Sequence, residues 1–258
     1  MNSTHQTLLA LIVVAVPVLF AISLHEVGHG YVAKYFGDTT AADEGRLSIN
    51  PLRHIDPFGT VLLPLMLYWL IQLPFGYAKP VPVEYDRLRN PKKHMAFVAL
   101  AGPAANFGMG VAWSIIGIVL VASGVTERFF FDMVRAGVTV NAVMMVFNLL
   151  PIPPLDGSHV LASVLPERVL RMLPTVPPDG GRTLASLLPA GLLAALPKRA
   201  LRLVNDVAVL DVLIFTAFIL LMRLHVLDSF LFKAMTVASA AFAKVAYPVA
   251  WLLAFMRG

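Results

Sequence analysis

The chain has 258 residues, of which 58% are hydrophobic and only 14% are charged, and its formal net charge is +5. Soluble domains carry about 25% charged residues, so this composition argues against a soluble domain and for an integral membrane protein. The basic residues fall in loops between apolar blocks, which fits the positive-inside rule better than nucleic-acid binding. The chain has no cysteine, which leaves His, Asp and Glu for any metal site.

The first apolar block, residues 8–31, predicts a membrane-spanning helix in which Pro17 introduces a kink. No Lys or Arg precedes Lys34, and the block runs on without a small-residue cleavage site, so we expect a retained span rather than a signal peptide. Polar and apolar residues alternate within the following stretch, 37–56, and hint at a short strand near residues 45–51.

Further apolar blocks follow along the chain. Residues 58–73 are too few for an ordinary span and predict a re-entrant or buried helix. Residues from about 95 to 122 and from about 136 to 150 predict a second and a third span. Residues 207–222 form another apolar block, and residues 226–256 either span the membrane or lie partly at its interface.

The charges of the loops predict the orientation of the chain. Loops 34–56, 75–94 and 157–206 carry three, five and six Lys or Arg residues, whereas loop 123–135 carries two. The positive-inside rule places the first three loops in the cytoplasm and the fourth loop, with the N-terminus, outside. The end of the first span, the start of the second and the end of the third then meet at the cytoplasmic side.

A five-residue motif, His25-Glu26-Val27-Gly28-His29, lies at the end of the first apolar block. Residues four apart share one face of a helix, so the imidazoles of His25 and His29 can bind one zinc ion. Glu26 is adjacent and can serve as general base toward a water that zinc activates. The alternative is a packed pair of histidines, but ionisable residues inside a membrane span are usually functional.

A catalytic zinc requires a third protein ligand, and Asp156 fits best because it follows the third predicted span at its cytoplasmic end. Prolines between residues 151 and 154 break that helix and place Asp156 in irregular backbone, which is tolerated at membrane depth where it lines a polar cavity. The alternative role of Asp156 is to N-cap the segment that follows. Other residues remain candidate ligands: His159, His54, Asp56 and Glu44.

Three further motifs accompany the first one in chain order. They are Gly76-Tyr77-Ala78-Lys79-Pro80-Val81-Pro82-Val83, Ala101-Gly102-Pro103-Ala104-Ala105-Asn106 and Phe147-Asn148-Leu149-Leu150-Pro151-Ile152-Pro153-Pro154-Leu155-Asp156-Gly157. Together the four motifs, over about residues 8–165, resemble the site-2 protease family of intramembrane zinc metalloproteases, in its compact form without a PDZ domain.

The resemblance implies a zinc metalloendopeptidase that hydrolyses peptide bonds within or near transmembrane segments of substrate proteins. It implies that His25, His29 and Asp156 bind one Zn²⁺ and that Glu26 is the catalytic acid/base. It also implies that Asn148 helps to bind the substrate or the oxyanion, for which an interhelical hydrogen bond is the alternative.

The proline-rich motif resembles the family's small membrane-associated β element, which is proposed to pair with an extended substrate by strand addition. The alternative is a loop at the membrane surface. The small residues before Asn106 indicate close helix packing, and we favour a structural role for Asn106. Residues 174–196 resemble an insertion with no assigned role. The substrate-binding candidates are Lys79, Pro80, Val81, Pro82 and Val83.

We therefore expect an all-α polytopic membrane protein with a bundle of about four to six transmembrane helices. It forms one domain over residues 1–258, with a catalytic core over about 8–165 and further helices over about 166–258. The expected location is the cell (inner) membrane, and the expected partners are a membrane-spanning protein substrate and the lipid bilayer, with homo-oligomerisation left open. The rival functions are a non-proteolytic metal-binding or scaffold protein, which has no need of Glu26, and a soluble metalloprotease, which the apolar blocks disfavour.

Overall fold

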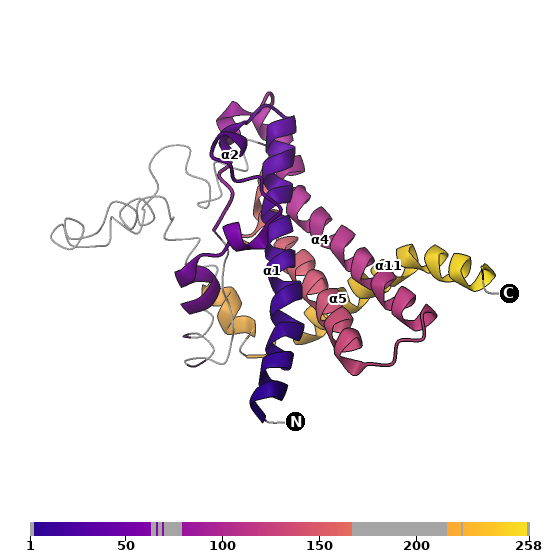
Figure 1. Ribbon diagram of the computed structural model, residues 1–258. Helices are drawn as coiled ribbons and strands as arrows, with labels where there is room; N and C mark the ends of the chain where they lie inside the picture. Colours follow the sequence, from indigo (N-terminus) through magenta and orange to yellow (C-terminus); the bar gives the residue numbers. More distant parts are fainter. Residues whose placement is uncertain are drawn as a thin grey trace.

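The computed structural model describes residues 3–62, 66, 69, 79–166, 216–222 and 224–256, and most of these residues are helical (Figure 1). Within them, four helices are long and apolar enough to cross a membrane. Each of the three predicted spans corresponds to a long apolar helix that begins before the predicted first residue, and the C-terminal block forms a fourth long helix. These helices are α1 (Ser3–Tyr35), α4 (Pro91–Ala122), α5 (Arg128–Asn148) and α11 (Asp228–Phe255).

Residues that favour the start and the end of a helix mark both ends of α4. The side chain of Asn90 accepts a hydrogen bond from the Lys93 N–H at 3.2 Å, and Pro91 takes the first helical position, where its missing N–H leaves no partner unsatisfied. The helix stops before Gly124, which has a φ of +72° that glycine adopts without strain. The chain then reverses into α5, which runs back along α4.

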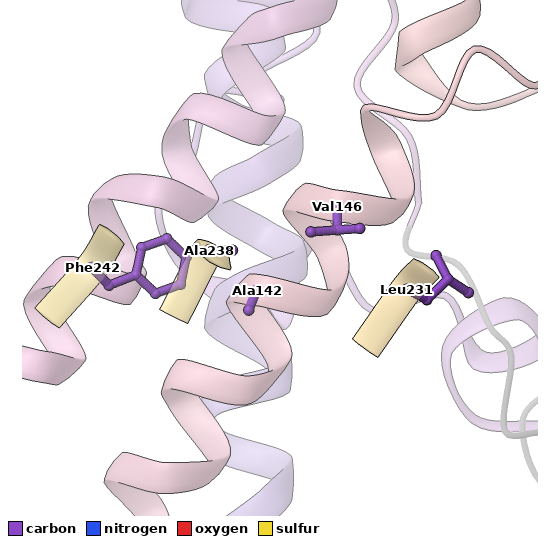
Figure 2. Close-up of a cluster of buried hydrophobic side chains, with 5 residues drawn as sticks. All are labelled: Ala142, Val146, Leu231, Ala238 and Phe242. Carbon is purple, nitrogen blue, oxygen red and sulfur yellow. The ribbon is translucent and has the colours of Figure 1, made fainter. Parts of the chain in front are cut away.

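Helix α4 is the centre of the bundle, because it packs against α1, α5 and α11. A buried hydrophobic cluster joins α5 to α11 (Figure 2). The Phe242 ring of α11 is fully buried and packs over Gly110 of α4, where any side chain would collide with it. Small residues opposite large ones allow the van der Waals packing that holds helices together in lipid. The cluster consists of Ala142, Val146, Leu231, Ala238 and Phe242.

Short elements connect these helices. Figure 1 shows α2 at the end of the bundle where α1 finishes, opposite the N-terminus. Helix α6 begins shortly after α5 and packs against α4. The short elements are α2 (Thr40–Asp43), η1 (Pro51–Arg53), the π-helical turn η2 (Pro57–Leu62), η3 (Tyr85–Arg87) and α6 (Asp156–Val164).

The predicted β elements are wrong for the part of the chain that the structure describes, which contains no strand. Residues 46–50 and residues 79–84 form no regular secondary structure. Pro80 and Pro82 have no N–H group to contribute to a ladder. The N–H of Lys79 donates to the His54 carbonyl at 3.0 Å, and the N–H of Val81 donates to a Glu26 side chain.

Several sequence predictions concern residues outside the described ranges. The block at 58–73 begins with η2, and of its later residues only 66 and 69 are described. The stretch 174–196 and most of the block at 207–222 also lie outside the described residues.

Candidate metal centre

The two histidines of the first motif face each other on α1. Their Nε2 atoms are 3.1 Å apart, and the rings meet edge to face with centroids 4.7 Å apart. His25 is 5% exposed and His29 is 9% exposed. The spacing of four residues therefore places both nitrogens at one buried point, as the helical pattern predicts.

Asp156, the first residue of α6, reaches the same point. Its Oδ2 atom lies 3.2 Å from His25 Nε2 and 3.3 Å from His29 Nε2. Leu155 occupies the N-cap position of α6 without a side-chain capping bond, so the alternative role of Asp156 as an N-cap is wrong. Gly157 packs directly on the carbonyls of Leu149 and Leu150, where a side chain would collide, and this contact brings Asp156 close to the end of α5.

The three atoms fit a zinc ion. Tetrahedral zinc with bonds of about 2.0–2.2 Å holds its ligand atoms about 3.3 Å apart, and the observed separations are 3.1, 3.2 and 3.3 Å. Asp156 Oδ2 is buried and lacks a hydrogen-bond partner among the described residues, although it lies close to both imidazoles. A buried, unpaired carboxylate oxygen is unfavourable, and a cation bound by all three atoms removes that penalty.

No other group of His, Asp or Glu within the described residues brings its ligand atoms together in this way. His54 is buried, and its Nε2 lies 2.7 Å from the Ser48 carbonyl. The ring of His159 lies 5.4 Å from that of Tyr85. The structure therefore brings together Asp156 with the two histidines and leaves His54, His159, Asp56 and Glu44 outside the cluster.

The far side of each imidazole contacts α4. His25 Nδ1 lies 2.7 Å from the Asn106 side-chain oxygen, and His29 Nδ1 lies 2.7 Å from the Val98 carbonyl. Both partners are acceptors, so each ring donates from Nδ1, and in the neutral form its Nε2 lone pair is directed toward Asp156. Such partners orient metal-binding histidines and raise their affinity for the metal.

Asn106 is itself fixed by buried hydrogen bonds. Its Nδ2 donates to the Ala21 carbonyl at 3.2 Å and to Asn141 Oδ1 at 3.0 Å, and Asn141 Nδ2 donates to the Gly137 carbonyl at 2.8 Å. Both asparagines are 0% exposed. These donors leave the Asn106 oxygen for His25, a contact that the sequence-based preference for a structural role missed. The available signal was an amide inside a predicted span, which must find polar partners there.

Gly102 explains the small-residue run before Asn106. A Cβ atom at this position would meet the His29 and His25 imidazoles. The glycine lets α4 pass close to both rings, so that the backbone at Val98 and the side chain of Asn106 reach them.

Glu26 contacts the proline-rich segment. Its Oε2 atom accepts a hydrogen bond from the Val81 N–H at 2.9 Å. Residues 79–83, predicted to bind substrate, therefore lie beside the predicted general base, although they form no strand.

Two residues near the end of α5 and the start of η3 complete the description. Asn148 donates to the Met144 carbonyl of its own helix at 3.0 Å, and its role toward a substrate stays a prediction.

Burial, together with the nearby Asp156 carboxylate, raises the pKa of Tyr85 to about 12. The Tyr85 phenol is therefore protonated at neutral pH, and the sequence analysis did not single it out.

Comparison with known proteins places this site in context. The chain is 35% identical over 163 residues to the "Putative zinc metalloprotease YwhC" of Bacillus subtilis (strain 168), which covers 60% of this chain and 69% of YwhC. It is 31% and 34% identical to proteins named "Putative zinc metalloprotease Rip2" from Mycolicibacterium smegmatis and Mycobacterium tuberculosis. Each Rip2 match covers 54% of this chain and 52% of the relative, so the chain spans about half the length of Rip2. No family model and no solved structure matches the chain.

The apolar helices, the two-histidine and one-carboxylate cluster and the adjacent glutamate define a class, the multi-pass membrane zinc metalloproteases. Within that class the chain belongs to the site-2 protease family.

Proposed function

We propose that the protein hydrolyses peptide bonds within or near the membrane-spanning segments of other proteins. It acts in the cell (inner) membrane, with the site toward the cytoplasm and the N-terminus outside, as the loop charges predict. The depth of the site carries the proposal. His29 and His25 lie six and ten residues before the end of α1 at Tyr35, which corresponds to about 9–15 Å along the helix axis. A hydrocarbon core of about 30 Å would include atoms at that depth.

The residues divide the chemistry between them. His25, His29 and Asp156 would hold one zinc ion, which would polarise the scissile carbonyl and make water a nucleophile at neutral pH. Glu26 then takes a proton from the attacking water and passes it to the leaving nitrogen, so that a C–O bond forms as the C–N bond breaks. The Val81 N–H directs Glu26 Oε2, which leaves Oε1 to carry the proton.

The substrate must expose its backbone before it can react. A transmembrane helix hides its carbonyls in hydrogen bonds to N–H groups four residues on, so the substrate has to unwind locally. Residues 79–83 support this proposal, because they form a non-helical segment beside Glu26 against which unwound backbone can lie. Asn148, near the end of α5, is the candidate to bind the oxyanion.

The test compares zinc content and cleavage in one preparation of the purified full chain, reconstituted with a model transmembrane substrate. Glu26→Gln removes the base without removing a ligand, so cleavage should fall by about 10²–10⁴-fold while bound zinc stays equal to that of the unaltered chain. Glu44→Gln is the matched control, because Glu44 is exposed and lies outside the cluster.

Two results would contradict the proposal. Cleavage by Glu26→Gln at the rate of the unaltered chain would remove Glu26 from the reaction. Zinc binding without any chelator-sensitive cleavage would favour the rival function, a metal-binding or scaffold protein.

A further inference from the structure

We propose that Arg46 is a positioning residue for the general base Glu26, and that it acts through the peptide group between Pro80 and Val81. This inference rests on the proposed function. Arg46 lies in the loop after α2, and no part of the family resemblance assigns it a role.

Arg46 and Glu26 hold opposite ends of the same peptide group. Arg46 Nη2 donates to the Pro80 carbonyl at 3.1 Å and to the Lys79 carbonyl at 2.9 Å. The Val81 N–H donates to Glu26 Oε2 at 2.9 Å. Because a peptide group is planar, fixing the Pro80 oxygen also fixes the direction of the Val81 N–H.

The two charges strengthen this arrangement. Hydrogen bonds in which one partner is ionised are about twice as strong as neutral ones. The guanidinium of Arg46 polarises the peptide from its oxygen, which makes the Val81 N–H a better donor to the Glu26 carboxylate. The planar guanidinium also lets Nη1 donate to the Arg53 carbonyl at 3.4 Å while Nη2 donates to the Lys79 and Pro80 carbonyls, and this shared anchor fixes the direction of Nη2.

Packing places Val81 beside Glu26. Val81 is 7% exposed and lies over Gly30, where a Cβ atom would meet the side chains of Val81 and Leu47. Gly30 follows Glu26 by four residues and therefore shares its helix face. Leu47 is the neighbour of Arg46, so the same contact anchors the Arg46 loop to α1. The packing sets how close the segment comes to α1, and Arg46 sets the orientation of its peptide.

The segment is held separately at its two ends. The Lys79 N–H donates to the His54 carbonyl at 3.0 Å, and the Glu84 N–H donates to Asp38 Oδ2 at 2.7 Å. Between these points Pro80 has no N–H, so its carbonyl is its one group for a backbone hydrogen bond, and Arg46 takes it. Removing Arg46 therefore frees the Lys79 and Pro80 carbonyls, while the N–H groups of Lys79 and Glu84 keep their own acceptors.

The proposed zinc ligands do not depend on this contact, because the outer partners of His25 and His29 lie on α4 and Asp156 belongs to α6. Loss of Arg46 should therefore lower kcat and leave KM and zinc content unchanged. We expect a fall of about 10–100-fold, since a misplacement of about 1 Å in a catalytic group costs about 100-fold. Arg46→Lys keeps the positive charge, so its kcat should lie between that of Arg46→Ala and that of the unaltered chain.

The experiment uses the full chain in detergent or lipid, with the model transmembrane substrate described above. It measures kcat, KM, zinc content and amide hydrogen exchange over residues 79–84 for Arg46→Ala and Arg46→Lys. Pro80 and Pro82 carry no amide hydrogen, so exchange at Val81 can be resolved, and it should be faster in Arg46→Ala. Arg89→Ala is the matched control, because Arg89 Nη2 donates to the Tyr35 carbonyl at 2.6 Å, outside this segment.

Unchanged exchange at Val81 in Arg46→Ala would overturn the proposal, whatever the enzyme does. A raised KM with unchanged kcat would assign Arg46 to substrate binding, and loss of zinc or of thermal stability would make its role structural; either result overturns the proposal. A third result separates the two proposals. If the unaltered chain cleaves no substrate, but amide hydrogen exchange at Val81 is still faster in Arg46→Ala, the Arg46 contact is supported and the proposed protease function is contradicted.

Discussion

The proposed zinc ligands and the proposed general base are neighbours in sequence but are held by different kinds of structure. The partner of His25 is Asn106, which is 0% exposed and bonded inside the helical bundle. The partner of Glu26 is Val81, which belongs to a connecting segment held by Arg46 from a loop. Helix cores open rarely and connecting segments open more easily. The difference suggests that the metal position is fixed by the bundle, while the orientation of the base is adjustable.

The largest expected effect comes from Asp156→Ala, which removes a ligand atom at the metal position. Zinc affinity should fall by more than about 100-fold, because that is the largest loss usual for a residue that only hydrogen-bonds to a metal ligand. Amide hydrogen exchange over residues 79–84 should stay the same. A competition titration with a zinc chelator measures the affinity. Asp132→Ala is the control, because Asp132 is bonded to Arg128 on α5. Unchanged affinity would assign the third ligand elsewhere.

Asn106→Ala should have the next largest effect. It leaves His25 without its acceptor, so we expect zinc affinity to fall by about 10–100-fold. The same titration tests this, with Ser114→Ala as control, because the Ser114 hydroxyl bonds to the Gly110 carbonyl within α4. If Asn106→Ala instead accelerated amide hydrogen exchange at Val81 and kept full zinc affinity, the view that the bundle fixes the metal position independently of residues 79–84 would be wrong.

A pair of glycines on α4 provides a smaller effect. Gly102→Ala adds a methyl group against His25 and His29, and overpacking of this kind costs about 1–3 kcal/mol. We expect this cost to weaken zinc binding, because the methyl group displaces the two imidazoles. Gly108→Ala meets no atom within 4 Å and should leave zinc affinity unchanged, while helix stability rises by up to about 1 kcal/mol. Equal zinc affinities in the two variants would contradict the close approach of α4 to the imidazoles.

The smallest effect is expected at Asp38, which accepts the hydrogen bond of the Glu84 N–H at the far end of residues 79–84. Burial alone would raise its pKa, but hydrogen bonds from the hydroxyl and N–H of Thr40 and from the Glu84 N–H, with the charge of Arg87, hold the pKa below its usual value. A depressed pKa stabilises the folded chain above the unfolded pKa of about 3.9. That stability is lost as pH falls through the lower folded pKa.

Exchange at Glu84, corrected for the intrinsic rate at each pH, should therefore accelerate as the solution is acidified below about pH 4. Asp38→Asn should show this acceleration already at neutral pH and should lose the pH dependence, with no change in zinc affinity. Asp43→Asn is the control, because Asp43 accepts a bond from Thr39 on the exposed surface. A Glu84 exchange profile that is the same in Asp38→Asn and the unaltered chain would contradict the role of Asp38.

Sequence reasoning succeeded where the relevant geometry is local or strongly constrained. The helical spacing of His25 and His29 places two nitrogens together, and the proline break after α5 marks Asp156 as the third member. It failed where geometry depends on how distant elements cross. The contact of Asn106 with His25 depends on where α4 crosses α1, which one sequence does not reveal. The contact of Arg46 with residues 79 and 80 joins two irregular segments, which have no periodic pattern.

The predicted strand at residues 79–83 shows a further limit. Its prolines and valines permit an extended edge strand, but residues 79–83 form no regular secondary structure. A strand also requires a partner strand, and here the segment lies against α1 and donates to Glu26. Local propensity therefore indicated a non-helical segment but not what that segment contacts.

The most direct test of the account is zinc K-edge X-ray absorption on the purified full chain. We predict one zinc with two imidazole nitrogens at about 2.0–2.1 Å and carboxylate or water oxygens at about 2.0–2.2 Å, and a loss of bound zinc in Asp156→Ala. A spectrum with fewer than two imidazoles, or one that Asp156→Ala leaves unchanged, would contradict a metal centre formed by His25, His29 and Asp156.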